Sequence, residues 1–236
     1  MITGTRRDAR ICAVLRWPLA LVTTGLEYVF PRVRVYRSEE TGDASDMPPE
    51  LPPENDDDRI QPAGQGYGPL LHRRYSVRIE GARLGPVDLM TELKRDPNRW
   101  APDFAVFRQT RGDRNGLDAG DEFLIRMPGP WNGPVRIVAA DPGSFRFATL
   151  QGHLEAGQIE FRTGLDDDGL LRFDIESWAR PGDVVSHLLY NRLPVAKEIQ
   201  LVMWTHACAS AAELAGGHAR GGVDVHTRRV ADPRPS

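Results

Sequence analysis

His153 and Glu155 are the pair in this sequence whose types and spacing best suit proton transfer. They stand in FATLQGHLEAGQIEF (residues 147–161), flanked by Gly152 and Gly157. An imidazole and a carboxylate this close in sequence can act as general base and general acid. They can also contact a ligand at the rim of a sheet, or hydrogen-bond the backbone of a turn and hold its shape. We expect the turn-shaping role, because the flanking strands place the pair at the rim of a sheet.

The rest of the sequence holds no competing signature of catalysis or metal binding. It contains no phosphate-binding loop, dinucleotide fingerprint, HExxH or GxSxG motif. Cys12 and Cys208 stand far apart without CxxC spacing, which argues against a zinc site or a disulfide framework and favours a reducing compartment. The net charge of -3 does not favour a nucleic-acid partner. We therefore expect a cytoplasmic protein with no cofactor and no metal.

The first 37 residues are basic and contain a short apolar stretch. Seven arginines stand against Asp8 and Glu27, and only ten uncharged residues separate Arg16 from Glu27. Such a run is too short to cross a bilayer. We expect residues 1–37 to form a helical segment that packs on the main domain, with weak peripheral contact with a membrane as the alternative.

Composition divides the remainder of the chain into three parts. Residues 38–68 are acidic and rich in proline and glycine without periodicity, which is typical of a linker. Residues 69–215 carry the regular patterns of a folded domain. Residues 216–236 contain two Gly–Gly pairs and are expected to form a flexible tail.

Alternation of apolar and polar residues predicts a series of strands in the main domain. The predicted strands are residues 72–79, 104–109, 121–127, 135–140, 144–150, 158–163 and 170–178. Short helices are expected within residues 85–102, and a long helix from about residue 182 to 215. Because the turns between most strands are short, the strands should pair antiparallel. The sequence thus predicts an α+β fold, in which a curved antiparallel sheet of about seven strands grips a long C-terminal helix.

The same alternation separates a charged outer face of the sheet from an apolar inner face. The outer face should be a solvated lattice of ion pairs formed by Arg78, Arg126, Arg136, Arg146, Glu160, Arg162, Arg172, Asp174 and Glu176. The inner face and the inward stripe of the last helix supply the candidate ligand contacts. These are Tyr75, Phe123, Ile125, Ile137, Phe147, Thr149, Phe161, Phe173, Ser177, Ile199 and His206.

An uncharged inner face beneath a long helix favours a protein that binds an apolar small molecule or lipid between sheet and helix. Two alternatives from other classes remain. One is an enzyme of cyclase or hydrolase type, with His153, Glu155 and His206 as its acid–base groups. The other is a non-catalytic interaction protein with a filled core, acting through its basic N-terminal segment and acidic linker.

Residues 100–215 resemble the domain-of-unknown-function 1990 family, which is uncharacterised. The positions that carry the resemblance are Thr149, Leu150, Gly152, His153, Glu155, Gly157, Phe161, Arg180 and Pro181. The sequence departs from the family's pattern at Gln151, Leu154, Gln158, Ile159 and Ala179. The resemblance implies no known activity. The order of elements is also similar to that of the helix-grip fold of the birch-pollen-allergen and START-like superfamily, an analogy of fold that does not fix function.

Overall fold

The structure is a computed structural model that describes residues 33–55, 57–113, 116–127, 132–182 and 194–231. Its strands are β1 (Val35–Thr41), β2 (Leu70–Glu80), β3 (Val106–Arg111), β4 (Glu122–Arg126), β5 (Asn132–Asp141), β6 (Ser144–Thr149), β7 (Glu155–Leu165), β8 (Leu171–Pro181) and β9 (His218–Val230). Its α-helices are α2 (Pro86–Arg95) and α4 (Pro194–Leu214). Short 3-10 helices are η1 (Ala44–Asp46), η2 (Pro53–Asn55), η3 (Ala63–Gln65) and η4 (Pro97–Arg99).

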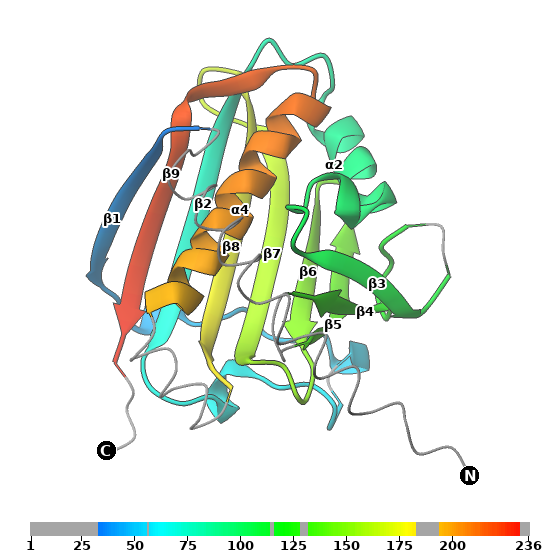
Figure 1. Cartoon of the computed structure of the whole chain (residues 1–236), viewed down its shortest axis with the longest axis vertical. Helices are drawn as coiled ribbons and strands as arrows, with labels where there is room; N and C mark the ends of the chain where they lie inside the picture. Colours follow the sequence, from blue (N-terminus) through cyan, green and yellow to red (C-terminus); the bar gives the residue numbers. More distant parts are fainter. Residues whose placement is uncertain (1–32, 56, 114–115, 128–131, 183–193, 232–236) are drawn as a thin grey trace.

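The strands form one sheet, with α4 lying across one of its faces (Figure 1). The order is β1-β9-β2-β8-β7-β6-β5-β4-β3, and every neighbouring pair is antiparallel except the parallel pair β1 and β9. The α+β class and the largely antiparallel sheet are therefore confirmed. The long C-terminal helix, expected from about residue 182, is confirmed over Pro194–Leu214, and residues 183–193 lie outside the described residues.

The prediction of about seven strands is wrong, because the described residues form nine. The additional strands are β1, from residues assigned to the N-terminal segment and linker, and β9, from the expected tail. In β9 the second Gly–Gly pair forms a bulge, where the register against β2 shifts between Val77 and Arg78. A Cβ on Gly222 would lie 2.5 Å from the carbonyl oxygen of Arg34, which directly precedes β1. Glycine at this position therefore lets the start of β1 pack closely against β9.

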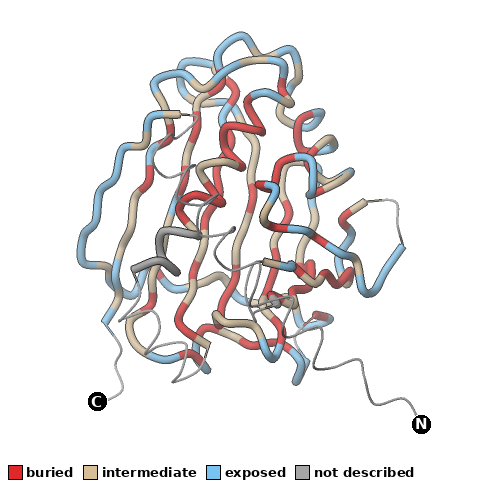
Figure 2. Tube along the Cα trace, viewed as in Figure 1, coloured by how far each residue is buried: buried red, intermediate tan, exposed pale blue. Residues whose placement is uncertain are grey.

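The inner face of the sheet is apolar and is covered by both α-helices. α4 packs on β9, β2 and β8, while α2 packs on β7. Between them lies an aromatic cluster in which Phe161 stacks on Phe145 with ring centroids 4.6 Å apart and meets Trp100 at 5.3 Å. The inward positions predicted by alternation lie in this core, and Figure 2 shows burial concentrated in α4 and the central strands. β1, in contrast, is exposed along most of its length.

The outer face is crossed by residues 43–55 and 57–68, which we call the strap. Asn55 of the strap donates to the carbonyl oxygen of Val138 at 3.2 Å, and Gln158 donates to that of Pro49 at 2.9 Å. Ile60 packs in a buried cluster with side chains of β5 and β6. These residues, expected to be a linker, are instead tied to the sheet over much of their length.

The strap changes the environment of the outer face. Arg136, expected to be solvated, is only 3% exposed and donates to Glu122 and Asp57. Asp174 and Glu176 are buried as well. Alternation alone placed these side chains on the correct face, but it could not show that Asn55 and Asp57 of the strap contact Arg136.

Residues 1–32 lie outside the described residues, so the predicted N-terminal helix and its contact with a membrane stay predictions, although residues 35–37 belong to β1 rather than to a helix. Within the ranges that are described, no helix is both long enough and apolar enough to span a membrane.

Candidate functional site

The turn between β6 and β7 is held by Gln61 of the strap. The side-chain amide of Gln61 donates to the carbonyl oxygens of His153 (3.1 Å) and Glu155 (3.2 Å), and its oxygen accepts the N–H of Gly152 at 3.2 Å. Thr149 adds a hydroxyl that donates to the carbonyl oxygen of Gln61 at 2.9 Å. Gly152 has φ +92°, which a residue with a side chain rarely adopts. The turn is therefore fixed by hydrogen bonds between the strap and the hairpin.

His153 takes part in this turn as a hydrogen-bond acceptor. Its Nδ1 accepts the backbone N–H of Glu155 at 2.9 Å, which leaves the proton of the neutral ring on Nε2. Burial lowers the pKa of His153 to about 4. The carbonyl oxygen of Glu155, 3.1 Å from Nδ1, opposes this shift more weakly because it favours the protonated ring. The imidazole is therefore neutral near pH 7.

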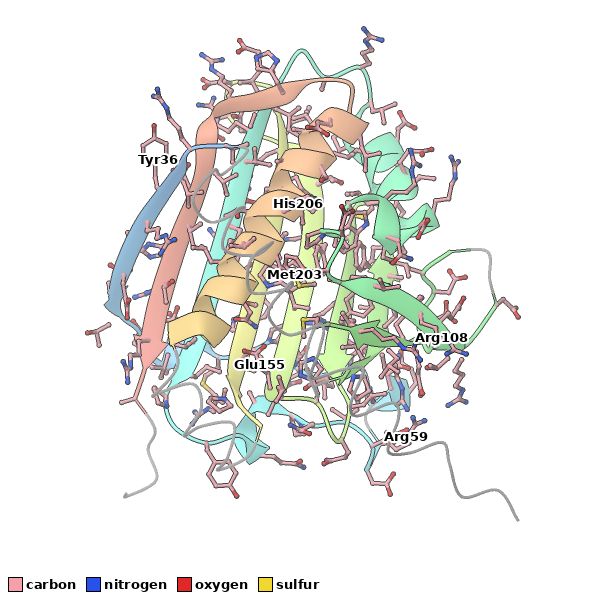
Figure 3. The ribbon with its side chains drawn as sticks, viewed as in Figure 1. Tyr36, Arg59, Arg108, Glu155, Met203 and His206 are labelled. Atoms are coloured by element: carbon pink, nitrogen blue, oxygen red, sulfur yellow. The ribbon has the colours of Figure 1, made fainter. Side chains whose placement is uncertain are left out.

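The carboxylate of Glu155 has a different hydrogen-bond partner from the backbone of the same residue. It accepts a hydrogen bond from the side-chain amide of Gln200 on α4. The oxygen of the same Gln200 amide accepts from Nη1 of Arg73 at 2.9 Å. We call Arg73, Glu155 and Gln200 the polar end of the inner face. Figure 3 shows Glu155 beside the N-terminal half of α4, with Met203 and His206 further along the helix.

The polar end adjoins three further groups that carry polar atoms. Tyr75, one inward position along β2 from Arg73, is 1% exposed, and burial raises the pKa of its hydroxyl while Arg73 opposes that shift. Ser177 is the partner of Arg73 in the β2–β8 register and is half-buried. Burial also raises the pKa of Cys208, with Asp174 adding to the effect, so the thiol stays protonated.

Trp204 lies one helical turn after Gln200, on the same side of α4. Its side chain is 7% exposed and meets Phe161 edge to face, with ring centroids 5.6 Å apart. The indole Nε1 is buried and has no hydrogen-bond acceptor in the described part of the chain. Buried donors are almost always paired in folded proteins, so this one needs an explanation.

The structure brings together most of the residues predicted to contact a ligand, although no contact with a ligand is tested by it. Tyr75, Phe123, Ile125, Ile137, Phe147, Phe161 and Phe173 all belong to the core cluster. The hydroxyl of Thr149 donates a hydrogen bond to Gln61 at the turn, and Ser177 lies beside the polar end. Ile199 lies within α4, in a part whose side chains are not described.

His206 is not on the stripe of α4 that faces the sheet. That stripe contains Trp204, Ala207, Cys208 and Ala211, all in the core cluster. At about 100° per residue, a residue two positions from Trp204 points to the opposite side of the helix. The sequence placed His206 inward because it follows the apolar Val202, which is itself outside that cluster.

From the sequence we did not identify three residues of the site, which are Arg73, Gln200 and Trp204. Arg73 shares the parity of Tyr75 and Val77 along β2, so alternation already places it inward. Gln200 and Trp204 carried no comparable signal, because α4 is apolar on most sides and its phase is ambiguous. No group of three or more His, Cys, Asp or Glu side chains able to hold a metal ion occurs among the residues that the structure describes.

Solved structures that match this chain do so at low similarity. A hypothetical protein from Helicobacter pylori is 12% identical, with a TM-score of 0.43 over 58% of this chain and 86% of that chain. A protein from Nitrosomonas europaea is 12% identical, with a TM-score of 0.41 over 62% and 94%. The di-domain ARO/CYC StfQ from the steffimycin biosynthetic pathway is 14% identical, with a TM-score of 0.42 over 65% of this chain and 53% of that chain.

No curated protein has a significantly similar sequence. The chain does match a protein family. Residues 69–210, more than half of the sequence, match the family described as Domain of unknown function (DUF1990). The match includes the hairpin with His153 and Glu155 and most of α4, and it confirms the resemblance seen in the sequence. The chain therefore belongs to the DUF1990 family.

Proposed function

We propose that this protein binds a small amphipathic molecule, apolar over most of its surface, between the inner face of the sheet and α4. The observation that carries the proposal is the polar end, where Gln200 links Arg73 to Glu155 on an otherwise apolar face. Arg73, Glu155 and Gln200 are each half-buried, so their polar groups lose part of their hydration on folding. Sites for small molecules combine an apolar wall with a few polar groups that orient the ligand, and this arrangement has that form.

The aromatic cluster restricts where such a ligand would lie. Phe145, Phe147 and Phe161 are at most 2% exposed and pack on one another with centroid distances of 4.6 to 6.0 Å. Because these rings fill the centre of the inner face, the ligand would occupy the end of the face near Glu155 and Gln200. The arrangement of sheet and α4 also supports assignment to the helix-grip class, although a fold does not determine a ligand.

The contacts of His153 and Glu155 favour binding over acid–base catalysis. The Nδ1 of His153 is engaged by the backbone N–H of Glu155, whereas the Glu155 carboxylate bonds to Gln200. A general base must present an accepting nitrogen to its substrate, and the accepting nitrogen here is already used. The pair therefore supports the shape of the turn and one wall of the site.

Native mass spectrometry of protein purified from its own host tests the proposal directly. The wild type should carry a noncovalent apolar molecule, or should take up the neutral probe 2-acetylnaphthalene when it is added. Arg73→Met removes the cation of the polar end and should weaken retention at least several-fold. Arg229→Met, which alters an exposed arginine of β9, is the matched control and should retain the molecule as the wild type does. A wild-type protein that neither carries nor takes up any apolar molecule would contradict the proposal.

A further inference from the structure

Two buried tryptophans of this protein differ in how their indole N–H groups are satisfied. Trp100, 1% exposed, donates from Nε1 to the carbonyl oxygen of Leu93 at 2.9 Å. Leu93 lies in the last turn of α2, whose carbonyl oxygens have no partner within the helix. Trp204 is 7% exposed, and no acceptor is present for its Nε1 in the described residues. Within the described residues, one buried indole N–H is therefore satisfied and the other has no partner.

An unpaired donor in an apolar core is costly, since it loses its hydrogen bond with water and gains nothing in return. The edge-to-face contact with Phe161 does not itself require an indole, because a phenyl ring can make such a contact without burying an N–H. The polar end lies one turn away on the same side of α4, through Gln200. Trp204 is thus one helical turn from the place where the proposed ligand would lie.

We propose that the indole N–H of Trp204 donates a hydrogen bond to a neutral oxygen of the bound ligand, such as a carbonyl or ether oxygen. This inference rests on the proposed function and adds to it a named donor and a chemical class of ligand. The oxygen is neutral, because a neutral donor among Phe161 and Cys208 does not offset the burial of a charged group. Trp204 accordingly selects ligands that carry an acceptor over hydrocarbons of the same shape.

Two probes of nearly equal size test this selection. 2-Acetylnaphthalene carries a carbonyl oxygen, and 2-ethylnaphthalene lacks it. The wild type should bind the ketone about tenfold more tightly than the hydrocarbon, because the hydrocarbon leaves the buried N–H unpaired. Trp204→Phe removes the donor and keeps an aromatic ring, so the variant should bind both probes with similar affinity. Titration calorimetry or fluorescence of the probes measures both affinities.

A second measurement does not depend on ligand binding. Trp204→Phe and Trp100→Phe both remove part of a buried indole ring, but only the second breaks a hydrogen bond within the protein. The midpoint of denaturation should therefore fall less for Trp204→Phe than for Trp100→Phe. An equal or larger fall for Trp204→Phe would show that its N–H serves the fold, and would overturn the inference.

The outcomes for this inference and for the proposed function are distinguishable. If the wild type binds both probes equally, the role of Trp204 is wrong and the proposed binding function stands. If neither probe binds and the protein from its host carries no apolar molecule, the proposed function and the role of Trp204 both fail.

Discussion

The imidazole Nδ1 of His153 accepts the backbone N–H of Glu155 at 2.9 Å, so this pair meets through the backbone of a turn. Gln61 of the strap closes the same turn by donating to the carbonyl oxygens of both residues. The spacing of His153 and Glu155 in the sequence suggests acid–base chemistry. Their described contacts instead hold a turn of the sheet next to the proposed site.

His153→Ala should lower the free energy of unfolding by about 1–2 kcal/mol, because the N–H of Glu155 loses its acceptor in a partly buried turn. His153→Asn is the matched control, since its side-chain oxygen can accept in place of Nδ1 and should recover part of the loss. Chemical denaturation of the three proteins gives the comparison. A His153→Ala protein with wild-type stability would show that the hydrogen bond does not hold the turn.

The stability of the wild type should also depend on the protonation of His153. The pKa of His153 in the folded protein is about 4, below the value near 6.5 expected in the unfolded chain. Between these values the unfolded chain binds more protons, so the free energy of unfolding falls as the pH falls from 6.5 to 4. The shift corresponds to about 3 kcal/mol. Because His153→Asn cannot titrate, the wild type should lose stability relative to this variant over that window. A constant difference between the two proteins from pH 7 to pH 4 would contradict the shift.

Gly157 is required by the close approach of β7 and β8. A Cβ at this position would lie 1.9 Å from the carbonyl oxygen of Trp178. Gly157→Ala should therefore destabilise the protein by about 1–3 kcal/mol or more, as expected for an overpacked position. Gly164→Ala, on the same strand, is the control, because no atom lies within 4 Å of its added Cβ. Similar denaturation midpoints for the two variants would exclude a specific steric role for Gly157.

The central sheet could be predicted from the sequence because its strands alternate clearly. Tyr75, Val77 and Phe161, assigned inward by alternation, are all buried in the core. The closing helix followed from the helical periodicity that begins near Gly182. These patterns are local, so a single sequence is enough to reveal them.

The edges and coverings of the sheet could not be predicted in the same way. β9 has a bulge at Gly222 and only a short apolar alternation around Val223 and Val225, so its sequence is typical of a tail. The strap is acidic and rich in proline, yet side chains such as Asn55 and Gln61 tie it to the sheet through hydrogen bonds. Such contacts between residues distant in sequence leave no periodic signal.

Phe161→Ala tests whether the centre of the inner face is filled. Phe161 is 0% exposed and packs against Phe145, Trp100 and Trp204. In a filled core the substitution should cost about 3–5 kcal/mol of unfolding free energy. Thermal or chemical denaturation measures this loss, and Leu165→Ala, at an exposed position of the same strand, should cost little. A small loss for Phe161→Ala, together with greater uptake of 2-acetylnaphthalene, would show instead that the ligand extends beside this ring.

His72 links the strap to β8. Its Nδ1 lies 2.7 Å from a carboxylate oxygen of Asp46 in the strap, and its Nε2 lies 2.7 Å from a carboxylate oxygen of Glu176 in β8. Both carboxylates are buried. Both nitrogens must therefore donate, which requires the charged imidazolium. Burial opposes this charge, but Glu176 and Asp46 outweigh it and raise the pKa of His72. For Glu176, burial is likewise outweighed by His72, Arg162 and Arg74, and its pKa falls to about 2.

The signs of these shifts define a pH window for the strap. Because the pKa of His72 is raised, its contribution to stability is complete below about 6.5 and is lost as the pH rises through its folded pKa. The contribution of Glu176 is complete above about 4.5 and is lost as the pH falls towards 2. The His72 contacts should therefore stabilise the protein most between about pH 4.5 and 6.5. Arg228 also lies next to Asp46, and Arg74 and Arg162 lie next to Glu176.

His72→Gln should lower the free energy of unfolding by about 1.5–3 kcal/mol near pH 6, because two buried carboxylates lose a charged hydrogen bond while keeping their arginine partners. The difference from the wild type should shrink as the pH rises above 6.5, since the wild-type imidazole then loses its charge too. The variant should also be cleaved within residues 47–58 by a protease that spares the wild type at pH 6. His226→Gln is the control, because His226 contacts Ser38 and Glu40 at the exposed edge of the sheet and should contribute little. If His72→Gln and His226→Gln unfold alike at pH 6, or if the loss for His72→Gln does not change up to pH 9, the imidazolium does not hold the strap.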